Sequence, residues 1–469
     1  MISKIHKLLN RDSLLCLLYL LPLFSGSLWA EEAGVPKMDL RTCMEKLSAH
    51  NYELRAHYLN TRALEAGAEV AKRERWPRLS AQCSVERHIQ PQRIEQPITN
   101  MQSSSFSRST SLVGVRFSLP LYTGGRLQAI ERIQRRLAEA AKAGAVDFRD
   151  RSALDLIEFY HQLQALEYLI ESVEASVKAL KAQEKQIDAM IRQQKAADVD
   201  RLRVQVRLST LEQQRIHIQD EKVQIRESLN FLIGVPAGTD WRINLMPKKI
   251  EPSEPSAAAQ RGNWVAVRQD EVAAERRREA AEEGVEMART LWHPNVQMIG
   301  SWSSRSGFSD TEPYEDGFIG LTISWDIWDG GSRHYRMEEA LQAQRAASVR
   351  EAGVRAGRKA EWVRAKSAFA SAQARWQVAL SNREAAVETL RIEHRKYEEG
   401  HGTIAEVLDA EAAILETESL IATARADYFG ALARRDYAAG LFFQPSARHP
   451  ALRSPLLTES TRVLPSKQP

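Results

Sequence analysis

Cysteine is scarce in this chain of 469 residues, which contains only Cys16, Cys43 and Cys83. Cys16 lies in an N-terminal segment that we expect to be removed, so one bridge, between Cys43 and Cys83, is the most that the processed chain could form. Disulfides therefore cannot be the main support of this fold.

Long apolar runs are also missing beyond the N-terminus. Basic residues precede the apolar run Ser13–Phe24, which has twelve residues and is followed by small ones. Because a membrane-spanning helix needs about 20 apolar residues, residues 1–30 are predicted to be a secretory signal peptide, cleaved after Ser27 or Ala30. If the processed protein enters a membrane, it must do so as β-strands.

Charge of one sign is not in excess either. The formal net charge is +4, and it falls to about +2 without residues 1–30, which argues against a surface for nucleic acid. The sequence has no phosphate-binding loop, no local signature of a Ser/His/Asp set and no metal-ligand spacing. We therefore expect no enzymatic activity and no cofactor.

Two alternating segments organise the rest of the chain. In Leu112–Gly125 and Phe318–Gly331, apolar residues alternate with small or polar ones, which is the pattern of a strand with two unlike faces. Leu79–Glu86 and Val296–Ser303 alternate in the same way. The polar segments between the paired strands, 88–110 and 305–317, are predicted to be loops.

Long helices follow and precede these strands. One helix is predicted over Asp39–Trp76, and another over Asn263–Leu291. Arg126–Gly234 contains no proline, so we expect two long helices joined by a short turn, the first covering roughly Arg126–Arg192. In the second helix, apolar residues recur every seven positions, as in a coiled-coil seam: Val204, Leu211, Ile218, Ile225 and Leu232.

The chain contains an internal repeat. Gly124, Gly125 and Gly234 recur 206 positions later as Gly330, Gly331 and Gly440, so the helical pair has the same length in both halves. The sequence therefore divides into a signal peptide (1–30), a first repeat of helix, two strands and long helical hairpin (31–246), a linker (247–262), a second repeat (263–440) and a disordered tail (441–469).

The predicted fold is mainly α, with long coiled-coil hairpins and four β-strands per chain that are suited to a membrane. Each strand is about ten residues long, enough to span a bilayer when tilted. Aromatic residues at the strand ends next to the helices would form a girdle at the membrane interface: Trp76, Tyr122, Trp292, Trp325 and Trp328. The alternative is a soluble antiparallel sheet that caps a helical bundle.

Four strands cannot close a barrel alone, and an open edge would leave backbone groups unsatisfied in lipid. Two copies would pool eight strands, and three copies would pool twelve around a lumen. A trimer therefore fits a channel better than a dimer.

With these features, the chain resembles the TolC family of outer-membrane efflux and secretion channels. The resemblance covers about residues 38–440 and rests on the duplication, the Trp-Pro and Trp-His-Pro helix stops, LPLYTGG (119–125), WDIWDGG (325–331) and YEEGHGTIAEVLDAE (397–411). It implies a homotrimer with a twelve-stranded barrel in outer-membrane lipid and a helical tunnel through the periplasm, working with a periplasmic adaptor and an inner-membrane pump.

The resemblance also implies residue roles. Glu406 and Asp409 match acidic residues that ring the periplasmic aperture, where they would attract cations. Tyr397 matches an aromatic residue that holds the tunnel shut by bonding to an acid on the first hairpin, for which Asp200 is the candidate here and Asp198 the second. Gly402 departs from the arginine of some members, so part of that lock is missing.

The hairpin tips are the expected contacts of the adaptor. We expect five residues there to meet its α-hairpin: Gln194, Lys195, Gly400, Gly402 and Thr403. The predicted function is that of a passive exit duct in a tripartite efflux pump or type I secretion system. The alternative is a periplasmic adaptor or coiled-coil scaffold that never enters the membrane, which should carry compact β domains around one hairpin.

Overall fold

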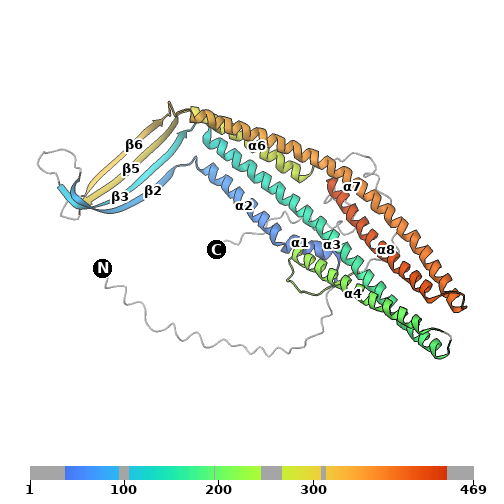
Figure 1. Cartoon of the computed structure of the whole chain (residues 1–469). Coiled ribbons are helices and arrows are strands. Elements are labelled where there is room, and N and C mark those ends of the chain that lie inside the picture. The colour runs from blue at the N-terminus through green and yellow to red at the C-terminus, as the bar shows by residue number, and fades with distance from the viewer. Residues whose placement is uncertain (1–36, 95–104, 195, 245–266, 308–312, 441–469) are drawn as a thin grey trace, which may run out of the picture.

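The computed structural model describes residues 37–94, 105–194, 196–244, 267–307 and 313–440. It is elongated, with a four-stranded sheet at one end and long helices that run away from it (Figure 1). The predicted signal peptide, the linker at 247–262 and the tail at 441–469 all lie outside the described residues.

The sheet consists of β2 (Arg78–Ile94), β3 (Ser105–Tyr122), β5 (Asn295–Gly307) and β6 (Tyr314–Ser324), in the order β2-β3-β5-β6. All three pairings are antiparallel, and β3 and β5 join the two repeats. The strands are 17, 18, 13 and 11 residues long. The sheet therefore has two free edges, β2 and β6.

These strands correct the predicted loops. The segment 88–110 is not one exposed loop, because β2 continues to Ile94 and β3 starts at Ser105; residues 305–307 and 314–317 are likewise in strands. Backbone hydrogen bonds between neighbouring strands hold these strand ends in the sheet, although their side chains no longer alternate between apolar and polar. The WDIWDGG segment, in contrast, leaves the sheet at Ser324.

The long helices confirm the predicted repeat geometry. α3 (Arg126–Arg192) and α7 (Ser332–Glu398) both have 67 residues, and α4 (Asp198–Leu232) and α8 (Ile404–Ala438) both have 35. α3 and α7 each begin after a glycine pair whose second member, Gly125 or Gly331, has φ of 92° or 87°. Glycine populates this left-handed region without steric cost, so each pair forms a sharp turn from strand to helix.

The shorter elements complete each half. α1 (Leu40–His50) and α2 (Tyr52–Arg73) precede β2, while α6 (Gln269–Arg289) and a 3₁₀ turn (Thr290–Trp292) precede β5. The short strands β1 (Lys37–Met38) and β4 (Arg242–Ile243) pair in parallel.

The prediction of a single helix over 39–76 is wrong, because the helix is interrupted at Asn51. The backbone of Asn51 is extended, with ψ of 122°. Its side chain accepts a hydrogen bond from the Leu54 amide and donates one to the Leu232 carbonyl. A residue that caps one helix and holds the end of another explains a break that the helical pattern alone does not predict.

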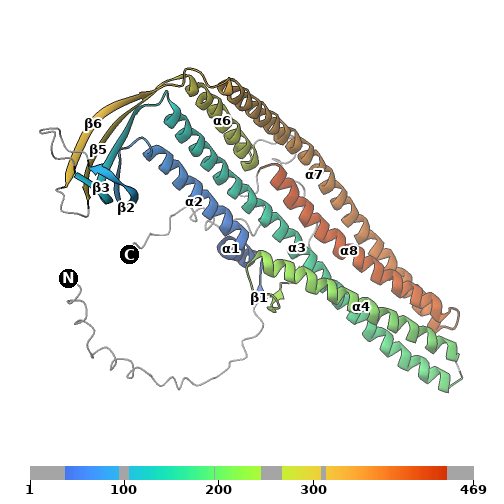
Figure 2. The same ribbon diagram turned by 60° about the vertical axis from the view of Figure 1, so that its left-hand side comes forward.

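The helices form one curved layer (Figure 2). Near the sheet, α2 packs against α3, α3 against α6 and α6 against α7; near the far end, α3 lies between α4 and α8, and α8 packs against α7. α3 and α7 thus run the length of the layer, and the shorter helices follow one another beside them. None of the described helices combines the length and the apolar character needed to cross a membrane.

The apolar seam of the second hairpin helix is largely where the sequence predicts it. Val204, Leu211 and Ile218 are buried in a cluster with α3 and α8, whereas Ile225 and Leu232 are half-buried against a second cluster nearer the sheet. Cys43 is buried in that second cluster and Cys83 is exposed on β2; both are free thiols, so no bridge joins them.

Candidate functional site: sheet faces and hairpin tips

The two faces of the sheet differ in chemistry. Antiparallel partners share a face, so the register groups Leu79 with Phe117, Gly300 and Ile319, and Ser80 with Arg116, Ser301 and Phe318. The first face is dominated by apolar side chains along all four strands, and the second by serine, glutamine, threonine and arginine. Large apolar side chains on the first face are exposed, for example Leu79, Val113, Ile319 and Leu321.

Aromatic residues lie where this sheet meets the helices. Trp76 precedes β2, Tyr122 ends β3, Trp292 precedes β5, and Trp325 and Trp328 follow β6. All five are exposed, Trp328 to 85%. The Trp325 indole donates a hydrogen bond to the Trp292 carbonyl at 3.2 Å, which ties the two strand ends together. The positions agree with a girdle, and the interface role itself stays a prediction.

The turn between α7 and α8 is tightly organised. Gly400 has φ of 75°, and the amides of His401 and Gly402 both donate to the Lys396 carbonyl. A Cβ on Gly402 would lie 3.1 Å from the Lys396 Cβ and 3.2 Å from the Tyr397 nitrogen. The close approach of the chain to the end of α7 therefore accounts for glycine at position 402.

Thr403 and Glu406 form a capping box at the start of α8. The Glu406 carboxylate accepts hydrogen bonds from the Thr403 amide at 2.8 Å and the Thr403 hydroxyl at 3.0 Å, and the Thr403 hydroxyl accepts from the Glu406 amide at 3.4 Å. Hydrogen bonds from Thr403 lower the pKa of Glu406, which keeps it ionised. In the single chain, then, the Glu406 carboxylate turns back toward the helix start.

The turn between α3 and α4 is built differently. Gln194 has φ of 57° and stands where the other tip has a glycine, while Lys195 lies outside the described residues. Asp200 accepts a long hydrogen bond, 3.4 Å, from the Ala197 amide at the start of α4. The two tips therefore differ in backbone and in capping.

Tyr397 and Asp200 come from different hairpins and lie near each other. The Tyr397 hydroxyl is buried without a hydrogen-bond partner among the described residues. Burial, and then the negative charge of Asp200, raise the pKa of Tyr397. The structure therefore brings the two groups of the predicted lock together but does not join them, and Asp200 instead lies 4.0 Å from Arg203. The second candidate, Asp198, lies 3.9 Å from Arg201.

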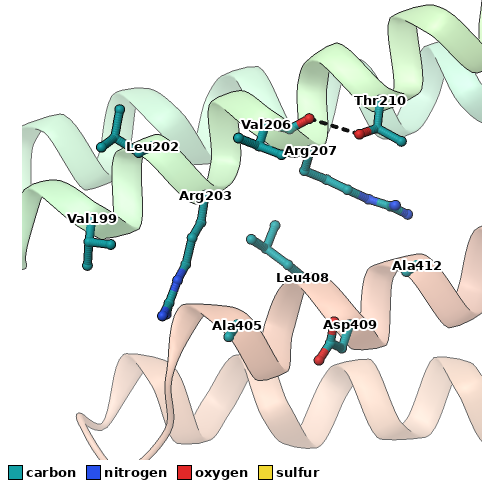
Figure 3. A pocket seen from close by; sticks show the side chains of 10 residues that line it. All are labelled: Val199, Leu202, Arg203, Val206, Arg207, Thr210, Ala405, Leu408, Asp409 and Ala412. Atoms are coloured by element: carbon teal, nitrogen blue, oxygen red, sulfur yellow. Dashed lines mark hydrogen bonds between the residues drawn. The ribbon is translucent and has the colours of Figure 1, made fainter.

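A groove of about 490 Å³ separates α4 from α8 just behind the tips, and Asp409 lies on its α8 side. Arg203 and Arg207 extend from α4 into this space (Figure 3). Its apolar lining includes Val199, Leu202 and Val206, which are 49%, 53% and 68% exposed. Glu406 and Asp409 are both exposed on α8.

Sequence reasoning missed a polar connection halfway along the helices. The Tyr168 hydroxyl of α3 donates to Glu418 of α8 at 2.5 Å, and Arg383 of α7 reaches the other oxygen of Glu418 at 2.5 Å. Glu418 is buried, so this contact links the two hairpins inside the layer. No local motif marks these three residues; only their arrangement in space does.

Residues 266–440 match the family model described as Outer membrane efflux protein. A comparison with curated protein sequences found no match. Within the described residues, no group of three or more His, Cys, Asp or Glu side chains is arranged to hold a metal ion.

Solved structures share the fold over most of the chain. The outer-membrane channel OprN is 21% identical with a TM-score of 0.71, covering 86% of this chain and 89% of its own. The outer membrane protein VceC from Vibrio cholerae is 18% identical with a TM-score of 0.72, and the match covers 86% of this chain and 96% of VceC. The CmeC outer membrane channel from Campylobacter jejuni is 14% identical with a TM-score of 0.73, and the match covers 90% of this chain and 89% of CmeC.

Proposed function

We propose that this chain, which has the fold of the TolC-like outer-membrane channels, forms a passive exit duct in the outer membrane with a helical tunnel in the periplasm. The duct receives its cargo from a periplasmic adaptor and an inner-membrane pump, in a tripartite efflux system or a type I secretion system. The observation that carries the proposal is the four-stranded sheet with an exposed apolar face and two open edges.

The edge strands of the sheet and the outermost helices of the helical layer lie on the same two sides of the molecule. β2 follows α2 at one edge, and β6 leads into α7 at the other. The outer helices are α2 and α4 on the first side and α7 on the second. A neighbouring copy that pairs its β6 with β2 thus brings its α7 toward α2 and α4, so one rotation closes both layers.

The helical edges have surfaces for such contacts. Tyr52, Leu59 and Val70 of α2 are 70%, 56% and 61% exposed, and Val349 and Val363 of α7 are 72% and 64% exposed. Three copies give a closed barrel of about twelve strands with a lumen, and closure removes the unpaired backbone groups of β2 and β6 from lipid. The apolar face then meets lipid, and the five aromatic residues at the strand ends form its periplasmic girdle.

The hairpin tips form the periplasmic mouth in this arrangement. Glu406 and Asp409 from three copies line a narrow opening, where their carboxylates attract cations. The Tyr397 hydroxyl, which has no described partner in the single chain, is proposed to donate to the Asp200 carboxylate when the mouth is closed and so to hold the two hairpins of one chain together behind it. Neutralising Glu406 and Asp409 together is expected to weaken cation selectivity and blockage by multivalent cations, and unchanged reversal potentials in that variant would refute the aperture role.

The adaptor is proposed to contact the tips through Gln194, Lys195, Gly400, Gly402 and Thr403. Crosslinkers placed at these residues should capture the adaptor under native expression, and crosslinkers placed on the barrel strands should not. Failure of every tip position to do so would remove the tips from the docking surface.

Fractionation and conductance test the duct itself. The full chain should appear in the outer-membrane fraction as heat-modifiable trimers and should open ion-conducting channels in planar bilayers. Recovery as a soluble periplasmic protein that leaves bilayers sealed would instead favour an adaptor or scaffold.

A further inference from the structure

The polar face of the sheet carries more arginine than carboxylate. Among the residues whose side chains are described, the register and the alternation of the strands place four arginines and two carboxylates on this face. The arginines are Arg78, Arg108, Arg116 and Arg305, and the carboxylates are Glu86 and Asp316. On the proposed function this face lines the barrel lumen, so its charge acts directly on whatever passes through.

Two of these arginines lie together at the tunnel end of the barrel. Arg78 is the first residue of β2 and pairs with Ser118, while Arg116 pairs with Ser80 on one side and Ser301 on the other. Residues related diagonally across a strand pair, as these two are, lie about 7 Å apart. Both side chains are exposed, and hydroxyl groups flank them as further hydrogen-bond donors.

No described carboxylate neutralises this pair. The ion pairs and side-chain hydrogen bonds among the described residues leave the guanidinium groups of Arg78 and Arg116 unused. Glu86 lies toward the other end of β2, beside His88 at 3.4 Å, and Asp316 lies two strands away from Arg116. The tunnel end of β6, which would meet β2 of the next copy, presents Gly320 and Thr322 on this face.

We propose that Arg78 and Arg116 form a ring of guanidinium groups at the junction of barrel and tunnel, which binds multivalent anions and favours anionic cargo carrying carboxylate or phosphate groups. The inference rests on the proposed function, because only barrel closure brings the copies of this pair around one lumen. Rings of arginine in water-filled pores attract anions, and the fixed fork of each guanidinium fits carboxylate and phosphate oxygens. The acidic mouth and the basic ring then act in series on charged solutes.

The opposite face offers a matched control. Arg87 is exposed on β2 beside Glu86, but it pairs with Ser109 and therefore points to the face assigned to the outside of the barrel. Its neutralisation removes the same charge from the same strand without touching the lumen.

The test uses full-length trimers in planar bilayers, with inorganic tripolyphosphate added on the extracellular side at low salt. Tripolyphosphate should block the wild-type channel, and the half-blocking concentration should rise by about ten-fold, or ~1.4 kcal/mol, in the variant with Arg78→Gln and Arg116→Gln. In a KCl gradient, the reversal potential of that variant should move toward the value expected for a channel that conducts only K⁺. Arg87→Gln should behave as wild type, and Arg78→Lys with Arg116→Lys should keep most of the block.

The outcomes separate the two proposals. Conducting trimers whose block and reversal potential are the same in wild type and in the Gln double variant overturn the anion ring and leave the duct intact. A protein that never conducts overturns both. A Gln double variant that runs as a heat-modifiable trimer shows that lost block does not come from lost assembly.

Discussion

Glu418 should stabilise the packing of the two hairpins against each other. Glu418→Ala takes away the acceptor of the Tyr168 hydroxyl and the partner of Arg383. Loss of a hydrogen bond to a charged group from the half-buried Tyr168 costs about 2 kcal/mol. The Arg383 side chain is 48% exposed and regains water, so its share is about 0.5 kcal/mol. We therefore expect Glu418→Ala to lower the free energy of unfolding by about 2–3 kcal/mol.

Urea titration of full-length protein in detergent, followed by circular dichroism, measures this loss. Glu416→Ala is the matched control, because Glu416 is exposed on the same helix and should change stability by less than about 0.5 kcal/mol. Adding Tyr168→Phe to Glu418→Ala should cost little more than Glu418→Ala alone, since both remove the same bond. Equal stability of the Glu418 and Glu416 variants, or full additivity with Tyr168→Phe, would show that the bond between Tyr168 and Glu418 does not stabilise the packing of the hairpins.

Three further predictions follow from local geometry. Burial, and then the hydrogen bond to Glu418, raise the pKa of Tyr168 from 10.0 to about 12, so the protonated hydroxyl stabilises the fold below pH 10. As the pH rises to 12, the free energy of unfolding of wild type should fall by about 2 kcal/mol more than that of Tyr168→Phe. Parallel curves of stability against pH for the two proteins would contradict this. In urea titrations, Gly234→Ala should lower the free energy of unfolding more than Gly238→Ala does. Both glycines have positive φ, but only at Gly234 would a Cβ clash with the His50 carbonyl oxygen. Equal losses of stability would be the contrary result. Thr403→Ala should destabilise the first turn of α8 by about 1 kcal/mol, seen as faster hydrogen exchange of the Glu406 amide, and unchanged exchange would exclude the capping role.

Repeat geometry could be predicted well from the sequence. Glycine pairs and proline-free stretches limit where a helix can start and stop, so the 206-residue displacement predicts helical pairs of equal length in the two halves. The structure has helices of 67 and 35 residues in each half. The seam from Val204 to Ile218 is likewise predictable, because burial against a partner helix requires the seven-residue period.

Other features depend on contacts that no local pattern shows. The break at Asn51 depends on its bond to Leu232, which is 181 positions away. The outer halves of β2 and β3 carry polar residues on both faces, so hydrogen bonding between strands defines them and side-chain alternation does not. The connection of Tyr168, Arg383 and Glu418 joins three helices and has no sequence signature.

The candidate site shows the same division. The capping box of Thr403 and Glu406 can be read from the sequence, since Thr-x-x-Glu before an apolar run is its signature. The groove beside Asp409, with Arg203 and Arg207 on its other side, depends on how α4 and α8 pack.

Closure of the sheet between copies is the central claim, and crosslinking of its edges tests it most directly. Chains that carry one cysteine among the first residues of β2 and one among the last residues of β6, with Cys83 replaced by serine, are oxidised in outer membranes. Some of these pairs of positions should link chains covalently up to a species of three and no further. Crosslinks confined within single chains, or absent at every pair of positions, would contradict a barrel shared between copies.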